Sequence, residues 1–141
     1  MLNIVFVAMG GALGSVARYL SYSYVNLLTK DSGNAFLARI VNSFPGAFPF
    51  ATFFVNVFGS ILAGFIYYFV IRNFENFDEN LKNFLFFGFL GGFTTFSAFS
   101  LDFFRIINAG QWHLGIIYIL STLVLAILGV FGGFYLAKII F

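Results

Sequence analysis

Three polar residues share one face of an otherwise apolar stretch in the first half of the chain. Thr52, Asn56 and Ser60 recur every four residues, and Gly64 continues the same spacing. Residues four apart are neighbours on the surface of a helix. An amide and hydroxyls on one face can donate hydrogen bonds to an anion, but the same groups also hold packed helices together. The stripe therefore indicates either the lining of a pore or a helix contact, and its spacing fits both.

A second stretch, residues 88–100, combines glycine with hydroxyl residues inside an apolar run. Gly91 and Gly92 are adjacent, and Thr94 follows closely. Glycine weakens a helix, and irregular backbone at membrane depth is tolerated only where its freed carbonyls and amides are buried in protein or face an ion or water. Freed carbonyls can bind a hard cation. We expect the helix that contains this stretch to be broken in mid-membrane.

Two phenylalanines of the same stretch, Phe96 and Phe99, lie three residues apart and share a helix face. The edge of an aromatic ring carries the positive part of its quadrupole, so rings that stand edge-on can line the path of an anion. The chain contains 24 Phe residues, however, and most such rings contact lipid or fill a core. Residue type and spacing fit either role.

Charged residues are rare in the apolar runs. Arg18 is the only one well inside a run. Its long side chain could reach the membrane interface, or it could face a water-filled vestibule and attract anions. Asp102 and Arg105 lie three residues apart near the end of another run and could form an ion pair. In the last run, Tyr118 and Thr122 are four apart and share a face.

Four apolar runs are long enough to carry these residues across a membrane, because a spanning helix needs about 20 mostly apolar residues. The expected spans are residues 2–28, 48–71, 83–107 and 112–140. Hydrophobic residues make up 61% of the chain and charged residues 9%, which leaves too little polar surface for a soluble globule. The sequence thus predicts an all-α membrane protein in which residues 1–141 form a single domain of four transmembrane helices.

Small residues and turn formers refine this picture. Pairs of glycines four apart, such as Gly10 with Gly14 and Gly129 with Gly133, predict close contact between helices. A tight turn is expected near residues 108–110, and residues 36–41 could form a short interfacial helix.

The positive charges give no clear orientation, which is normally set by the side that bears more Lys and Arg. In the loops and at the ends of the spans, the two sides carry three each: Lys30, Arg39 and Arg105 on one side, and Arg72, Lys82 and Lys138 on the other. A chain without a charge bias can insert both ways up. Two oppositely oriented copies could then pair, so the tie suggests an antiparallel dual-topology homodimer.

Several function classes lack the residues that they need. The chain has no Cys, one His and no paired carboxylates or phosphate-binding loop, so it is not expected to be an enzyme. A net charge of +2 without a basic patch argues against nucleic acid as a partner. A small four-span proton-coupled exporter would need an acid deep in the bundle, and Asp102 lies near the end of its run. A non-transporting helical scaffold is the other alternative.

Three segments of the chain resemble the Fluc (CrcB) fluoride channels, and together they extend the resemblance over nearly the whole length. They are Gly10–Tyr19, Ala51–Ser60 and Gly88–Phe99, in the same order as in that family. The resemblance implies a fluoride-selective passive channel that exports fluoride from the cytoplasm and relieves fluoride toxicity. It also implies an antiparallel dual-topology homodimer with two pores in the bacterial inner membrane, in contact with lipid.

The resemblance also implies roles for particular residues. Arg18 is expected to be the vestibule arginine, Asn56 the pore asparagine, and Phe96 and Phe99 the rings whose edges line the ion path. The complete expected fluoride pathway is Arg18, Thr52, Asn56, Phe96, Ser97, Phe99, Tyr118 and Thr122. Gly91 and Thr94 match positions whose backbone carbonyls, from both subunits, hold a structural sodium ion (Na+) at the dimer centre.

At three positions the chain departs from the family pattern. Ala126 stands where a further hydroxyl is frequent, Ala98 stands where Thr is common, and Asp102 replaces the usual Glu. These differences affect details of ion coordination rather than the assignment to the family.

Overall fold

The computed structural model describes residues 2–30, 48–72 and 78–141, and every regular element within these ranges is helical. Four segments are long and apolar enough to cross a membrane: Leu2–Thr29, Phe50–Arg72, Glu79–Asn108 and Trp112–Ile140. The prediction of an all-α chain with four such helices is confirmed. The interfacial helix expected at residues 36–41 lies outside the described part of the chain.

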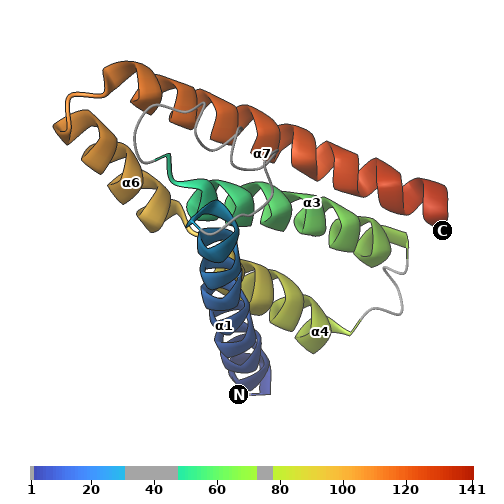
Figure 1. The fold of residues 1–141 in the computed structure, drawn as a ribbon. Helices are drawn as coiled ribbons and strands as arrows, with labels where there is room; N and C mark the ends of the chain where they lie inside the picture. Colours follow the sequence, from blue (N-terminus) through green and yellow to red (C-terminus); the bar gives the residue numbers. More distant parts are fainter. Residues whose placement is uncertain (1, 31–47, 73–77) are drawn as a thin grey trace.

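Three of the four segments are continuous helices, α1 (Leu2–Lys30), α3 (Phe50–Arg72) and α7 (Trp112–Ile140). Their long apolar sequences favour helices because a helix satisfies all of its own backbone hydrogen bonds, as a lipid environment demands. In Figure 1, α3 and α7 lie side by side, and α1 crosses them at a steep angle.

The third segment is built from four shorter pieces, α4 (Glu79–Asn83), η1 (Phe84–Leu90), α5 (Gly91–Phe93) and α6 (Phe96–Asn108). The Asp78 carboxylate caps α4 by accepting hydrogen bonds from two backbone amides at 2.6 and 3.1 Å. The η1 piece has the wider turns of a π-helix, which are frequent at functional sites.

Two extended residues separate α5 from α6. Thr94 has φ −78° and ψ 156°, and Thr95 has φ −150° and ψ 112°. The Thr95 hydroxyl accepts a hydrogen bond of 3.2 Å from the Ala98 amide and thereby caps the start of α6. The Thr95 side chain therefore stabilises the point at which α5 ends and α6 begins.

Glycines bring the helices into close contact, as their spacing predicted. A Cβ atom on Gly10 would lie 2.9 Å from the Cα atom of Gly88, so α1 and η1 meet backbone to backbone. A Cβ atom on Gly133 would overlap the Ile61 carbonyl, and one on Gly129 would lie 3.3 Å from the Val57 carbonyl. Both α1 with η1 and α3 with α7 thus pack at distances that only glycine permits.

The turn between α6 and α7 is as tight as expected. Gly110 has φ +76°, a conformation that favours glycine. The Gly110 amide donates to the Ile107 carbonyl at 2.9 Å and the Gln111 amide to the Ile106 carbonyl at 3.1 Å, which is a Schellman motif. This short link holds α6 against the first turns of α7.

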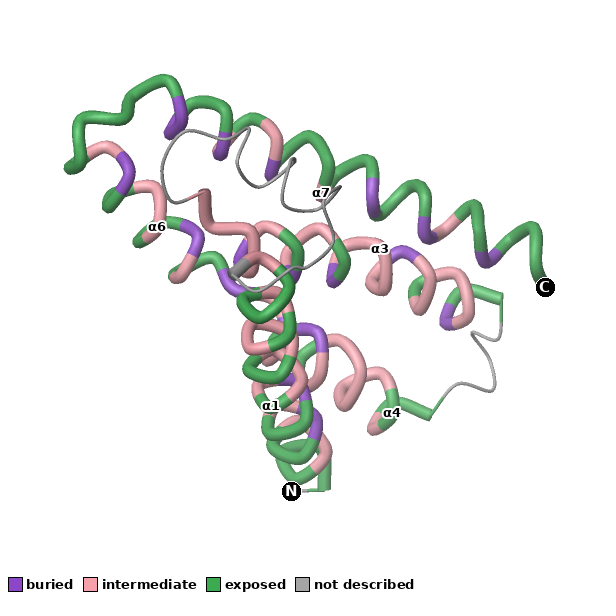
Figure 2. The backbone as a smooth tube through the Cα atoms, viewed as in Figure 1, coloured by how far each residue is buried: buried purple, intermediate pink, exposed green. Residues whose placement is uncertain are grey.

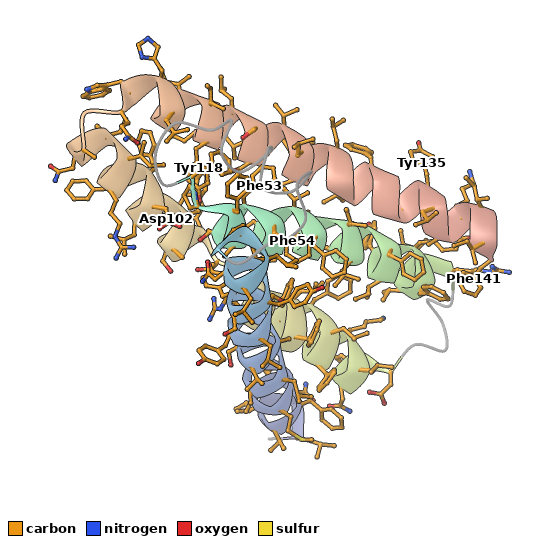
Figure 3. All side chains as sticks on the ribbon, viewed as in Figure 1. Phe53, Phe54, Asp102, Tyr118, Tyr135 and Phe141 are labelled. Carbon is orange, nitrogen blue, oxygen red and sulfur yellow. The ribbon has the colours of Figure 1, made fainter. Side chains whose placement is uncertain are left out.

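One cluster of buried apolar residues lies where α6 and α7 meet. It consists of Phe99, Ile106, Leu114 and Tyr118, with partly buried apolar residues around it. Tyr118 and Phe53 point between the helices, whereas Tyr135 points away from them (Figure 3).

Much of the remaining apolar surface is exposed in the single chain, especially along α1 and the outer side of α7 (Figure 2). In the most apolar 18-residue stretch of α1, only 11% of the residues are buried. Such a surface is stable where lipid or another protein covers it.

Candidate functional site

Two cavities lie on either side of the extended residues of the third segment. The first, here called the α3–α7 cavity, has a volume of about 320 Å³, and its lining includes Asn56, Ser60, Thr95, Phe96, Phe99 and Thr122. The second, the α1 cavity, measures about 420 Å³ and is lined by Ser15, Arg18, Tyr19, Tyr22, Thr95, Ser97 and Ala98. Thr95 lines both cavities.

Asn56 holds the extended backbone through two hydrogen bonds. Its amide nitrogen donates to the Thr95 carbonyl at 3.1 Å, and its amide oxygen accepts from the Thr95 N–H at 2.8 Å. A side-chain amide has two N–H donors, and no partner for the second is found among the described residues. Asn56 therefore contacts another helix and also presents a second N–H group at a cavity. Its geometry is compatible with both interpretations of the polar stripe, a helix contact and the lining of a pore.

The same hydrogen bonds change the surroundings of two backbone carbonyls. In a continuous helix the Thr95 amide would donate to the Gly91 carbonyl, and the Ala98 amide would donate to the Thr94 carbonyl. These amides instead donate to the side chains of Asn56 and Thr95. The Gly91 and Thr94 carbonyls have thus lost their helical donors, which makes them suitable ligands for a hard cation.

Arg18 lines the α1 cavity and reaches the third segment. Its Nη1 atom donates to the Thr94 carbonyl at 3.5 Å, a long hydrogen bond. Ser97 lines the same cavity, and its hydroxyl lies 3.3 Å from that of Thr95. The guanidinium has five N–H donors, so this cavity offers a positive charge and free donors to an anion.

Phe96 and Phe99 both line the α3–α7 cavity but differ greatly in exposure. Their ring centroids are 5.8 Å apart with the planes tilted by 41°. Phe96 is 76% exposed, whereas Phe99 is 7% exposed and belongs to the core. Phe96 therefore has little to pack against within a single chain.

Tyr118 and Thr122 are both buried on α7, but in different ways. The Thr122 hydroxyl lines the α3–α7 cavity and donates to the Tyr118 carbonyl of its own helix at 2.6 Å. Tyr118 is fully buried against Phe99 with ring centroids 5.1 Å apart, and its hydroxyl has no hydrogen-bond partner in the described chain. A buried hydroxyl left without a partner costs about 1–3 kcal/mol, and such groups often mark a site for water or an ion.

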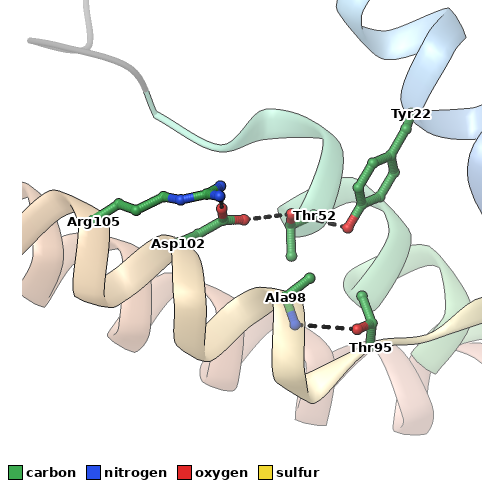
Figure 4. A network of polar contacts seen from close by, with 6 residues as sticks. All are labelled: Tyr22, Thr52, Thr95, Ala98, Asp102 and Arg105. Atoms are coloured by element: carbon green, nitrogen blue, oxygen red, sulfur yellow. Dashed lines mark hydrogen bonds and ion pairs between the residues drawn. The ribbon is translucent and has the colours of Figure 1, made fainter.

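Thr52 is buried in a network that joins three helices (Figure 4). Its hydroxyl donates to Asp102 at 2.6 Å and lies 3.0 Å from the hydroxyl of Tyr22. Asp102 also pairs with Arg105 at 3.5 Å, which confirms the predicted ion pair. The Asp102 side chain is only 16% exposed, so this acid is more enclosed than its place in the sequence suggested.

The structure thus gathers most of the expected pathway residues but not all of them. Asn56, Phe96, Phe99 and Thr122 line the α3–α7 cavity, and Arg18 and Ser97 line the α1 cavity. Thr52 and Tyr118 line neither. Thr95 and Tyr22 were not among the residues predicted from the sequence. Thr95 is one of two adjacent threonines after a Gly-Gly pair, and Tyr22 lies one helical turn after Arg18, so both had a signal in the sequence.

Comparison with known proteins relates this geometry to a family. A family model described as CrcB-like protein, Camphor Resistance (CrcB), matches residues 5–134. A protein of Rhizobium meliloti (strain 1021) is 41% identical over 138 residues, which is 98% of each chain. A protein of Agrobacterium fabrum is 39% identical over the whole length of both proteins. A protein of Bacteroides fragilis is 36% identical over 98% of each. All three relatives are named fluoride-specific ion channel FluC.

Proposed function

Because this chain belongs to the CrcB-like family, a family of ion channels and not of enzymes, we propose that it is a passive, fluoride-selective channel. It exports fluoride from the cytoplasm and so relieves fluoride toxicity. The chain is a multi-pass membrane protein with four helices that can cross the bilayer. Its proposed location is the bacterial inner membrane.

One observation in the structure supports this function best, namely the α3–α7 cavity. It brings together four of the eight expected pathway residues, Asn56, Phe96, Phe99 and Thr122. Fluoride is small and strongly hydrated, so a selective path must replace its water with closely spaced donors. The second N–H of Asn56 and the ring edges are donors of this kind, since both present positive partial charge.

The distribution of charge also suits passive flow. Among the described residues, no Lys or Arg lines the α3–α7 cavity, so an ion there would meet dipoles rather than a fixed countercharge that could trap it. Arg18 lines the larger α1 cavity, where a positive charge raises the local concentration of anions. Fluoride that enters the cell as the neutral acid ionises in the cytoplasm and leaves through this path.

The active form is proposed to be an antiparallel dual-topology homodimer in which the third span is broken in mid-membrane. The tie of Lys and Arg charges supports insertion in both orientations. The 76% exposure of Phe96 and the sparse burial of α1 support a second copy, which would cover both. A ring edge that lines a pore needs a wall opposite to it, and a second copy supplies that wall.

A structural sodium ion at the dimer centre is part of the proposal. The Gly91 carbonyl fits this ion because its helical donor is diverted and Gly91 is exposed on the surface of the single chain. The Thr94 carbonyl has also lost its helical donor, and sodium would bind it in place of the long 3.5 Å hydrogen bond from Arg18. Bound there, sodium would balance the negative ends of carbonyl dipoles that two copies direct at one another.

The function is tested with purified protein in liposomes loaded with potassium fluoride, with valinomycin to carry the countercharge. Fast fluoride efflux that requires valinomycin, with little efflux from matched potassium chloride liposomes, is the expected result. Efflux that requires a proton gradient and disappears in Asp102→Asn would indicate an exporter instead. A folded protein without any efflux would indicate a helical scaffold.

A further inference from the structure

The two cavities meet at a single residue. Among the described residues, Thr95 alone belongs to the linings of both the α3–α7 cavity and the α1 cavity. Its hydroxyl is directed to the α1 cavity, because it contacts the Ser97 hydroxyl and the Ala98 amide, and both residues line that cavity. Its backbone is directed to the α3–α7 cavity, because its N–H and its carbonyl both bond to Asn56. The shortest route between the cavities therefore passes Thr95.

Hydrogen-bond donors from both cavities converge on this point. From the α1 cavity, the Nη1 atom of Arg18 donates to the Thr94 carbonyl at 3.5 Å. From the α3–α7 cavity, the amide of Asn56 donates to the next carbonyl along the chain, that of Thr95, at 3.1 Å. None of the described residues that line either cavity is Asp or Glu, so an anion on this route meets no like charge in the walls.

The O–H group of Thr95 is available to an ion. A hydroxyl has one donor and two acceptor positions, and the Ala98 amide uses an acceptor position at 3.2 Å (Figure 4). The other hydrogen bond of this hydroxyl within the described chain joins it to the Ser97 hydroxyl at 3.3 Å, and either oxygen can be the donor. That distance is well above the usual value of about 2.7–2.8 Å for two oxygens. The Thr95 O–H can therefore turn to an anion without breaking a strong hydrogen bond.

We propose that the Thr95 hydroxyl is a fluoride contact at the boundary between the two cavities. It donates to the ion between the attracting charge of Arg18 and the second N–H of Asn56. Thr95 is only 7% exposed and Asn56 holds its backbone, so this donor has a fixed place where little water competes for it. The inference rests on the proposed function, since it adds a contact to the same fluoride path.

The first test measures the initial rate of fluoride efflux from liposomes at increasing internal concentrations of potassium fluoride. Thr95→Val has nearly the same shape but no hydroxyl, and it should raise the half-saturating fluoride concentration roughly tenfold or more, because a hydrogen bond to an ion is lost. Thr95→Ser keeps the hydroxyl and should restore most of the affinity. An unchanged half-saturating concentration in folded Thr95→Val would overturn the proposal.

The loss of the donor must be separated from the loss of a helix cap, because the Thr95 hydroxyl also caps α6. Asp78→Ala is the matched control, since Asp78 caps α4 through hydrogen bonds of 2.6 and 3.1 Å and lines neither cavity. Loss of either cap should lower the melting temperature, but Asp78→Ala should leave the half-saturating fluoride concentration unchanged. If both variants melt earlier and both keep the affinity of the unmodified protein, Thr95 is only a helix cap and the proposal is wrong.

A binding measurement tests the contact without transport. A ligand that binds the folded protein raises its melting temperature. Sodium fluoride, compared with sodium chloride at the same concentration, should therefore stabilise the unmodified protein more than Thr95→Val. A protein that does not conduct but shows this difference would refute the proposed function and leave the Thr95 contact standing. A protein that neither conducts nor is stabilised by fluoride would refute both, and for a protein that conducts, the half-saturating concentration decides.

Discussion

Replacement of Asn56 by Ala should reduce both fluoride conduction and stability, and the structure gives the size of each effect. The substitution removes the two hydrogen bonds to the Thr95 backbone, at 3.1 and 2.8 Å. At about 0.5–1.5 kcal/mol for each bond, the loss of stability is about 1–3 kcal/mol. The protein should therefore melt at a lower temperature but still fold, since the glycine contacts between the helices remain.

The effect on conduction follows from the second N–H of Asn56. A hydrogen bond to a charged group contributes about 1.5–3 kcal/mol, and each 1.4 kcal/mol or so is a factor of about ten in rate. Fluoride efflux per folded protein should fall roughly 10- to 150-fold in Asn56→Ala. Efflux is normalised to the reconstituted, monodisperse fraction of the protein. A partial loss of folded protein therefore cannot account for this decrease.

Ser60→Ala provides the matched control for this experiment. Ser60 lies one turn after Asn56 and lines the same cavity, but its hydroxyl donates to the Asn56 carbonyl within its own helix at 2.8 Å. Its removal breaks no contact between helices, so efflux should change less than threefold. If folded Asn56→Ala conducts as fast as the unmodified protein, Asn56 is only a contact between helices and the reasoning is wrong.

Three further predictions concern the rings, the helix contact and the cation. Phe96→Ile should reduce efflux with little change in the melting temperature of detergent-dispersed single chains, because the ring is 76% exposed. Phe99→Ile should reduce both the efflux and the melting temperature, because Phe99 is buried. Equal effects of the two variants on both measurements would make the rings packing residues. Gly133→Ala should lower stability by about 1–3 kcal/mol in denaturant titrations, because the methyl would overlap the Ile61 carbonyl, whereas Gly132→Ala has no atom within 4 Å to meet and should be neutral. Exchange of sodium for a large organic cation should lower efflux or dissociate the dimer in size-exclusion chromatography, and unchanged efflux and dimer would contradict the sodium site.

Much of the fold follows from the sequence because a bilayer leaves few alternatives. Apolar runs of this length can satisfy their backbone only as helices, so four membrane-crossing segments were predictable. The contact of α3 with α7 was also foreshadowed by Gly129 and Gly133, because glycines four apart form a smooth strip on one helix face. The Asp102 to Arg105 pair is local and followed from a spacing of three residues.

The polar side-chain contacts between helices could not be predicted, because they depend on how the helices cross. No spacing relates Asn56 to Thr95, which lie 39 residues apart, yet their two hydrogen bonds fix the extended backbone. Tyr22 is similarly joined to Thr52 only because α1 crosses α3 at that level. The burial of Tyr118 in the core is a further result of tertiary packing, since its spacing from Thr122 suggested that both line one surface.

The central claim, a passive channel selective for fluoride, is tested most directly by current recording in a planar bilayer with potassium fluoride on one side and potassium chloride on the other. A passive fluoride channel should give a steady current without any proton gradient, with a reversal potential that follows the fluoride gradient and shifts when fluoride alone is changed. A current that reverses with the chloride or potassium gradient, or no current from protein that is folded in the same preparation, would contradict it.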